Sequence, residues 1–153
     1  MRTGKLSRHI IRFNQLVGEG DWIYHQAALK LGFSDCALWI LYTLWEEEGV
    51  YTQSGICEMT SLPRQTVNSA LKKLVAAGYL SLCPLPSGHS KEVVITPSGR
   101  KLMEEVITPV FKAEDRAIEA LDEEELKAFL ETFEKLNSNL KRELSSIKAG
   151  DRG

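Results

Sequence analysis

The stretch "SLPRQTVNSALKKLVAAGYL", residues 61–80, most constrains what this chain can fold into. Val67, Leu71 and Leu74 recur at positions i, i+4 and i+7, which places them on one face of a helix. The early proline suits a first helical position, where its missing N–H costs nothing, and the late glycine suits a helix end. We therefore expect a helix over residues 63–77 with one buried, apolar face.

The opposite face of this helix is polar and basic. Gln65, Ser69 and Lys72 share it. Amide and hydroxyl side chains near a helix N-terminus are suited to base edges in the major groove, and lysines to phosphates. The same residue types are common on any solvated helix, so this helix alone does not distinguish the two interpretations. The remaining polar positions of the helix are Thr66, Asn68 and Lys73.

The neighbouring segments complete a recognisable order. A short helix is expected over 53–59, with Thr52 as its N-cap, followed by a tight turn. After the longer helix, "YLSLC" and "KEVVIT" predict two strands around the polar loop "PLPSGHS". Thr96 and Pro97 then start another helix. Short helix, turn, longer helix and hairpin together predict a winged helix-turn-helix.

The N-terminal third predicts two helices. Residues 6–31 have helical periodicity, but "GEGD" at 18–21 is expected to bend or divide that helix, since each helical glycine costs about 1 kcal/mol relative to alanine. Gly32 suits a helix stop and Ser34 the next N-cap. The helix that follows, "CALWILYTLWEEE", is apolar on most sides and is therefore expected to be buried.

The C-terminal helix leaves an apolar stripe without an obvious cover. It is expected to begin at Asp122, and its stripe comprises Leu126, Phe129, Phe133, Leu136, Leu140 and Leu144. The N-terminal helix has a similar spare stripe. We therefore expect a mainly α protein with a small β-wing: dimerisation helices at 1–32 and 108–153, and a winged helix-turn-helix at 33–107.

Charge is distributed unevenly along the chain. The net charge is −2, which by itself argues against a polyanion partner. Residues 61–101 nevertheless contain six basic residues against a single acid, Glu92. Because the field at a surface is set within about 10 Å at moderate salt, a basic segment can bind a polyanion locally.

Several classes of protein are not expected. No apolar run is long enough to span a bilayer, and the N-terminus does not resemble a signal peptide, so a cytoplasmic protein without membrane contact is predicted. Three widely spaced cysteines predict neither a disulfide framework nor a zinc site. The sequence contains no catalytic motif and no glycine-rich phosphate loop, so neither an enzyme nor a cofactor is expected.

Three segments resemble the MarR family of bacterial multiple-antibiotic-resistance-type repressors: "LGFSDCALWILYTL", "YTQSGICEMTSLPRQTVNSALKKLVAAGYL" and "KEVVITPSGRKLMEE". The resemblance covers most of the chain. It implies a homodimeric repressor whose recognition helices, here Pro63 to Ala77, enter successive major grooves of a pseudo-palindromic operator in double-stranded DNA. The contacts it implies are Thr52, Ser54, Arg64, Gln65, Thr66, Asn68, Ser69, Lys72 and Lys73. The alternative is a winged-helix module that binds a protein partner and no DNA.

The wing departs from the family pattern. An acidic residue followed by an arginine usually occupies its tip, whereas this loop reads "PSGHSKE". His89 lies where the arginine is expected, and an uncharged imidazole attracts the minor groove less. We expect Lys91 to supply a phosphate contact instead.

The resemblance also implies a small aromatic or phenolic effector. Candidate contacts cluster in the first two helices: Trp22, Tyr24, His25, Trp39 and Tyr42. Each ring is also a reasonable core residue. Cys57 is expected to be a buried core thiol. Cys36 begins the second helix, where the helix dipole would lower the pKa of its thiol, and redox sensing there is a minor hypothesis.

Overall fold

The computed structural model describes residues 5–46, 49–86 and 90–147. The chain forms two compact units, Met1–Val110 and Phe111–Gly153, and α5 runs through the boundary between them. The elements in chain order are α1 (Lys5–Leu31), α2 (Asp35–Glu46), α3 (Gln53–Thr60), α4 (Arg64–Ala76), β1 (Leu80–Pro84), β2 (Lys91–Ile95), α5 (Pro97–Glu119) and α6 (Glu123–Ser145). The predicted class, mainly α with a small β-wing, is confirmed.

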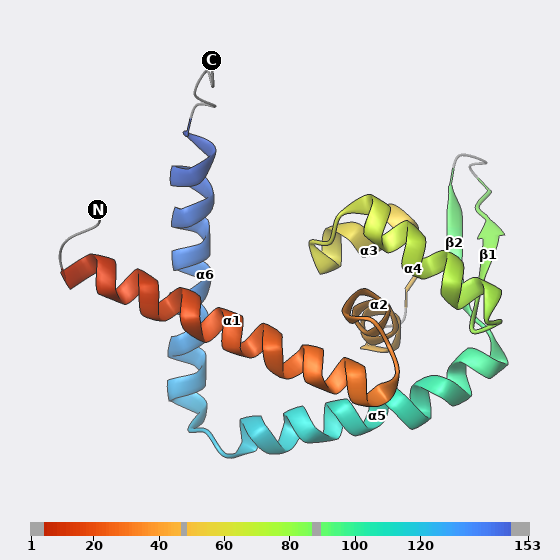
Figure 1. Ribbon diagram of the computed structural model, residues 1–153, viewed down its shortest axis with the longest axis horizontal. Helices are drawn as coiled ribbons and strands as arrows, with labels where there is room; N and C mark the ends of the chain where they lie inside the picture. Colours follow the sequence, from red (N-terminus) through yellow and green to blue (C-terminus); the bar gives the residue numbers. More distant parts are fainter. Residues whose placement is uncertain (1–4, 47–48, 87–89, 148–153) are drawn as a thin grey trace. The chain divides into compact units, whose positions relative to one another are not determined.

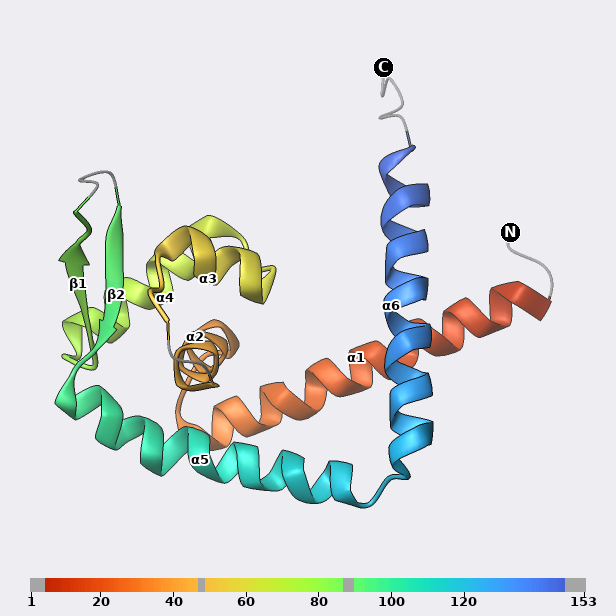
Figure 2. The same cartoon turned by 180° about the vertical axis from the view of Figure 1, so that it is seen from behind.

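The core of the first unit is built around α2. This helix lies between α1 and the α3–α4 pair in both views (Figure 1, Figure 2). Leu38, Ile40 and Leu41 on α2 are buried together with Ile56 of α3 and Leu71 of α4. Burial on several sides explains why the α2 sequence is apolar nearly all round rather than amphipathic.

The wing follows directly from the end of α4. Gly78 has φ +77°, a conformation that favours glycine, and the N–H of Tyr79 donates to the carbonyl of Leu74. The chain then enters β1, which pairs antiparallel with β2 from Leu80↔Ile95 to Pro84↔Lys91. An isolated bridge between Thr52 and Glu92 joins the start of α3 to the same sheet.

The base of the wing is tied to α5 by a compact junction. The Thr96 hydroxyl lies 2.7 Å from the carbonyl oxygen of Gly78, to which it donates, and accepts from the N–H of Gly99 at 3.0 Å. A Cβ at position 99 would overlap the carbonyl oxygen of Tyr79. The predicted Thr96 cap is confirmed, and the close approach explains why a glycine follows it.

Of the two outcomes expected at residues 18–21, a bend or a division, the division is wrong, because Lys5–Leu31 is one uninterrupted helix. A glycine lowers helix stability by only about 1 kcal/mol, too little to stop a helix of this length. Gly32 with φ +79° then ends α1, and the Ser34 hydroxyl accepts from the N–H of Ala37 as predicted. Among the described helices none is by itself long and apolar enough to cross a membrane; α1 and α2 meet the criterion only as a pair bent by 90°.

The second unit contains α6, which begins as predicted. The Asp122 carboxylate accepts from the N–H groups of Glu124 and Glu125 at 3.0 and 3.1 Å. No residue of α6 is buried. Phe129 and Leu144, on its apolar stripe, are each 59% exposed. Of the predicted stripe, Phe129 and Leu144 are thus exposed, whereas Leu126, Phe133, Leu136 and Leu140 are half-buried.

Candidate nucleic-acid interface

Helix α4 separates its residues as the sequence predicts. Val67, Ala70, Leu71 and Leu74 are buried, and the other face is open to solvent. Its exposed polar residues are Arg64, Gln65, Thr66, Ser69, Lys72 and Lys73; Asn68 is half-buried. Pro63 is the N-cap rather than the first helical residue and provides no side-chain cap, so backbone N–H groups of the first turn stay open to a ligand.

The N-terminus of α3 is held by its own side chains. The Thr52 hydroxyl accepts from the N–H of Gly55 at 3.1 Å and lies 3.0 Å from the Ser54 hydroxyl. Thr52 is therefore first a structural cap, whereas Ser54 is exposed. The Gln53 side-chain amide donates to the carbonyl of Arg64 at 3.5 Å, which links the starts of α3 and α4.

A groove of about 300 Å³ runs along one flank of α4 toward the wing. We call it the wing-side groove. It brings together residues from α3, α4 and both strands, and its charged members, Arg64, Lys72 and Lys91, are all basic. Four of its members were not predicted as contacts: Gln53, Leu71, Leu82 and Ser90. The alternation of side chains along β1 could have indicated Leu82, because Leu82 lies on the same face of the strand as the buried Leu80.

A second hollow, of about 730 Å³, lies on the other flank of α4, against the α1–α2 junction. The predicted contacts Gln65, Thr66, Ser69 and Lys73 line it. Across from them, the Nδ1 of His25 donates to the Asp35 carboxylate at 2.8 Å. The predicted contacts of α4 are thus divided between two hollows: Arg64, Asn68 and Lys72 line the wing-side groove, and the other four line this one.

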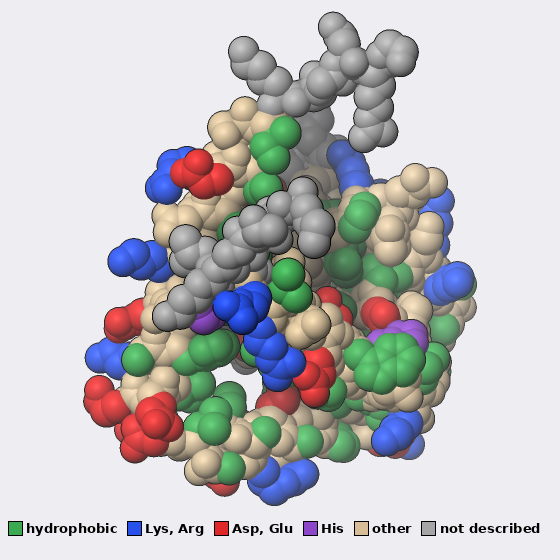
Figure 3. All heavy atoms as spheres, turned by 60° about the vertical axis from the view of Figure 1, so that its left-hand side comes forward, with side chains coloured by type: hydrophobic (Ala, Val, Ile, Leu, Met, Phe, Trp, Pro, Cys, Tyr) green, Lys and Arg blue, Asp and Glu red, His purple; other side chains and the backbone are tan. Residues whose placement is uncertain are grey.

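The charge of the wing-side groove differs from that of other parts of the surface. On the face shown in Figure 3, Lys and Arg side chains lie among Asp and Glu side chains, and hydrophobic side chains reach the surface between them. In the groove no acidic side chain is among the described lining residues. His89, predicted at the wing tip, lies outside the described residues.

The candidate effector contacts form two ring groups. Tyr24, Trp39 and Tyr42 are linked by centroid distances of 4.9 and 5.4 Å. Trp22 and His25 lie 5.2 Å apart, and Trp22 is 60% exposed. His25 lines the hollow at the α1–α2 junction, whose described lining includes none of the other four. The structure therefore does not gather all five candidates around that hollow.

Two expectations for the cysteines are wrong. Cys57 is half-buried rather than part of the core, because the neighbouring Ile56 is the residue that points inward. Burial, with a smaller contribution from Cys57, raises the pKa of the Cys36 thiol, whereas the helix dipole was expected to lower it. Among the described residues no group of three or more His, Cys, Asp or Glu side chains is placed to hold a metal ion.

Comparison with known proteins identifies the family of this arrangement. A model of the MarR family matches residues 31–89, which include α2, α3, α4 and β1. The HTH-type transcriptional regulator YdgG of Bacillus subtilis (strain 168) is 30% identical over 146 residues, covering 92% of this chain and 96% of the relative. The chain belongs to the MarR family. It is thus a transcriptional regulator of the winged helix-turn-helix type.

Solved structures of MarR-family proteins share the fold. NMB1585, a MarR family regulator from Neisseria meningitidis, is 21% identical with a TM-score of 0.76, covering 95% of this chain and 100% of its own. The PcaV transcriptional regulator from Streptomyces coelicolor, solved in complex with its natural ligand, is 15% identical with a TM-score of 0.68. That match covers 90% of this chain and 98% of PcaV. At these identities the likeness concerns the fold.

Proposed function

We propose that the exposed face of α4, with the wing-side groove beside it, binds double-stranded DNA. The observation that carries the proposal is the groove itself: Arg64 and Lys72 from α4 and Lys91 from β2 line one hollow whose described members include no acid. Elements distant in sequence contribute cations to the same place, as a groove that follows a phosphate backbone requires.

The roles of the α4 residues follow from their positions. Gln65 is exposed near the open N-terminus of α4, where a side chain that enters the major groove meets base edges. Asn68 and Ser69 lie one turn further on, although the Ser69 hydroxyl donates to the Gln65 carbonyl at 3.0 Å and must turn to reach DNA. Arg64, Lys72, Lys73 and Lys91 bind phosphates, as does Ser54 at the start of α3.

The protein acts as a homodimer in this proposal. The exposed members of the α6 stripe, Phe129 and Leu144, each 59% exposed, support dimerisation through the terminal segments 1–32 and 108–153, around a DNA-binding domain at 33–107. Two α4 helices about 34–36 Å apart fit successive major grooves of a pseudo-palindromic operator. We further propose repression, relieved by a small aromatic or phenolic effector that favours another spacing of the helices.

Fluorescence anisotropy tests the proposal. A duplex from the protein's own upstream region and a scrambled duplex are titrated at several salt concentrations. We expect tighter, salt-dependent binding to the native duplex. In Gln65→Ala the preference for the native duplex should shrink by about 1–3 kcal/mol, the usual value of a base contact.

The control is Gln15→Ala, the same change at an exposed position of α1, which should retain the preference. Equal, weak binding of both duplexes, with no effect of Gln65→Ala, would contradict base reading by α4. A winged-helix module with a protein partner would then be the better account.

A further inference from the structure

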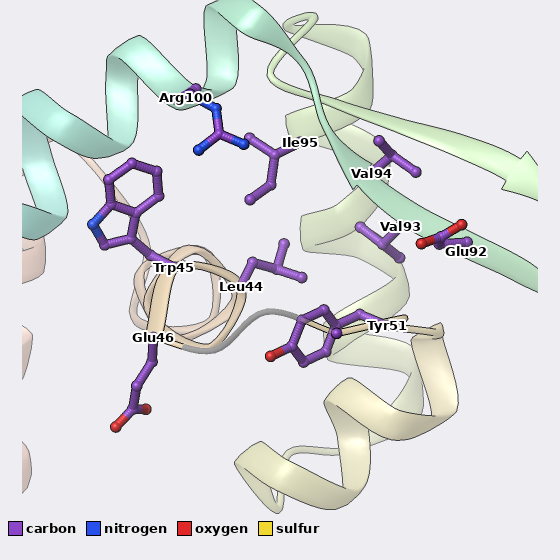
Figure 4. A pocket seen from close by; sticks show the side chains of 10 residues that line it. Leu44, Trp45, Glu46, Tyr51, Glu92, Val93, Val94, Ile95 and Arg100 are labelled. Atoms are coloured by element: carbon purple, nitrogen blue, oxygen red, sulfur yellow. The ribbon is translucent and has the colours of Figure 1, made fainter.

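A third pocket, of about 470 Å³, lies behind the wing. It is formed by the C-terminal end of α2, the link at Gly49 and Tyr51, strand β2 and the first turn of α5 (Figure 4). It shares no described lining residue with either hollow beside α4. None of its members is a predicted DNA or effector contact.

The pocket has a positive end and a negative end. The guanidinium carbon of Arg100 lies 5.8 Å from the centre of the Trp45 ring. Figure 4 shows Glu92 on the far side of the pocket from Trp45, while the Glu46 carboxylate points away from the other labelled side chains. Leu44, Val93 and Ile95 lie between the two ends. Neither Arg100 nor Glu92 forms an ion pair with another residue that the structure describes.

This arrangement selects the charge of a ligand. A simple anion would gain Arg100 but meet the Glu92 carboxylate, and a simple cation would gain Glu92 but meet Arg100. A neutral apolar molecule would gain a contact with neither charge. We propose that the pocket binds a small zwitterion with an apolar body, whose carboxylate faces Arg100 and whose ammonium faces Glu92. The pocket has a typical ligand-site volume and suits a dipeptide of apolar residues.

The pocket is joined to the wing-side groove by backbone contacts. The N–H of Val93 donates to the carbonyl of Tyr51 at 2.7 Å, and Thr52 bridges Glu92. Tyr51 and Glu92 line the pocket, whereas their neighbours Thr52 and Lys91 line the groove. A ligand that shifts this link therefore changes the placement of the groove residues, and so the affinity for DNA. This coupling rests on the proposed function.

Calorimetry without DNA tests the site, with Leu-Leu as the probe. Two capped forms keep the apolar body and remove one charge each: N-acetyl-Leu-Leu lacks the ammonium and Leu-Leu-amide lacks the carboxylate. We expect saturable, one-to-one binding of Leu-Leu, weakened about tenfold or more by either cap, because one charged hydrogen bond is lost in each case. No binding, or equal binding of all three compounds, would overturn the proposal.

Two variants locate the contacts. Arg100→Gln should weaken the binding of Leu-Leu about tenfold and leave the binding of Leu-Leu-amide unchanged. Glu92→Gln should weaken the binding of Leu-Leu about tenfold and leave the binding of N-acetyl-Leu-Leu unchanged. The controls, Lys101→Gln and Glu104→Gln, remove the same charges from exposed residues that do not line the pocket. Circular dichroism checks that each variant is folded. If Glu92→Gln is unfolded, the binding of N-acetyl-Leu-Leu to the unchanged protein still tests the contact between Glu92 and the ammonium. Equal effects of the variants and their controls would overturn the assignment.

The DNA experiment separates the two proposals. If the unliganded protein shows no preference for the native duplex, the proposed function fails while the calorimetric result for the pocket stands. If the unliganded protein binds DNA, saturating Leu-Leu should change its affinity by about fivefold or more, the usual range of allosteric coupling. An unchanged affinity would overturn the coupling between pocket and groove.

Discussion

Helices α4 and α6 are both amphipathic, yet their apolar faces differ in burial. In α4 four apolar residues are buried against the rest of its unit, and the polar face is open. In α6 no residue is buried, although Phe129 and Phe133 lie 5.7 Å apart on its stripe. The same periodicity thus marks a core face in one helix and an interface candidate in the other. The difference lies in burial, because the apolar face of α4 is buried within its unit and no residue of α6 is buried.

The largest effect is expected where the apolar face is already covered. Leu71 on α4 is only 3% exposed. Leu71→Ala should lower the free energy of unfolding by about 2–5 kcal/mol, because buried methyl groups are lost and a cavity is left. Urea denaturation at fixed protein concentration measures this. Lys73→Ala, on the exposed face of the same helix, should change stability little. A Leu71→Ala protein as stable as its parent would contradict the packing described for α4.

The corresponding test in α6 concerns association rather than folding of one chain. Phe129→Asp should raise the dimer dissociation constant about a hundredfold, since an unpaired charge buried at an interface costs about 2–5 kcal/mol. Sedimentation equilibrium measures the constant. Glu131→Gln, at an exposed position of the same helix, is the matched control. If the parent protein is a monomer at micromolar concentration, α6 has no such role.

The two helices also differ at their first turns. The Asp122 carboxylate caps α6, whereas α4 begins at Pro63 without a side-chain cap. Asp122→Ala should therefore lower the free energy of unfolding by about 1 kcal/mol. Thermal unfolding at one protein concentration is a suitable measurement, with Asp115→Ala, the same change within α5, as the control. Equal losses in the two variants would mean that the cap contributes no stability.

The smallest effect separates the basic residues of the two helices. Lys72→Ala should weaken DNA binding several-fold for every sequence and reduce the salt slope by about one, because one phosphate contact is lost. Lys141→Ala removes the same charge from an exposed position of α6 and should leave the slope unchanged. The slope comes from anisotropy titrations between low and moderate salt. A Lys72→Ala slope equal to the parent's would remove Lys72 from the phosphate contacts.

Local signals in the sequence predicted the elements well. Ser34, Thr52, Thr96 and Asp122 are N-caps as expected, since a cap depends on a residue and the N–H groups two or three positions later. The inward face of α4 was predicted for the same reason, because helical periodicity is a property of neighbouring residues. The expected break in α1 failed, because a local glycine penalty was weighed without the cooperativity of a long helix.

The sequence by itself determined the winged helix-turn-helix order, the polar face of α4 and the apolar stripe of α6, because periodicity and capping are encoded within a few residues. Only the tertiary structure decided which distant residues meet. It placed Lys91 and Lys72 in one groove, divided the α4 contacts between two hollows, and set Arg100 and Glu92 at opposite ends of one pocket. Such meetings depend on strand register and helix packing, which arise from the whole core at once and leave no short-range signal.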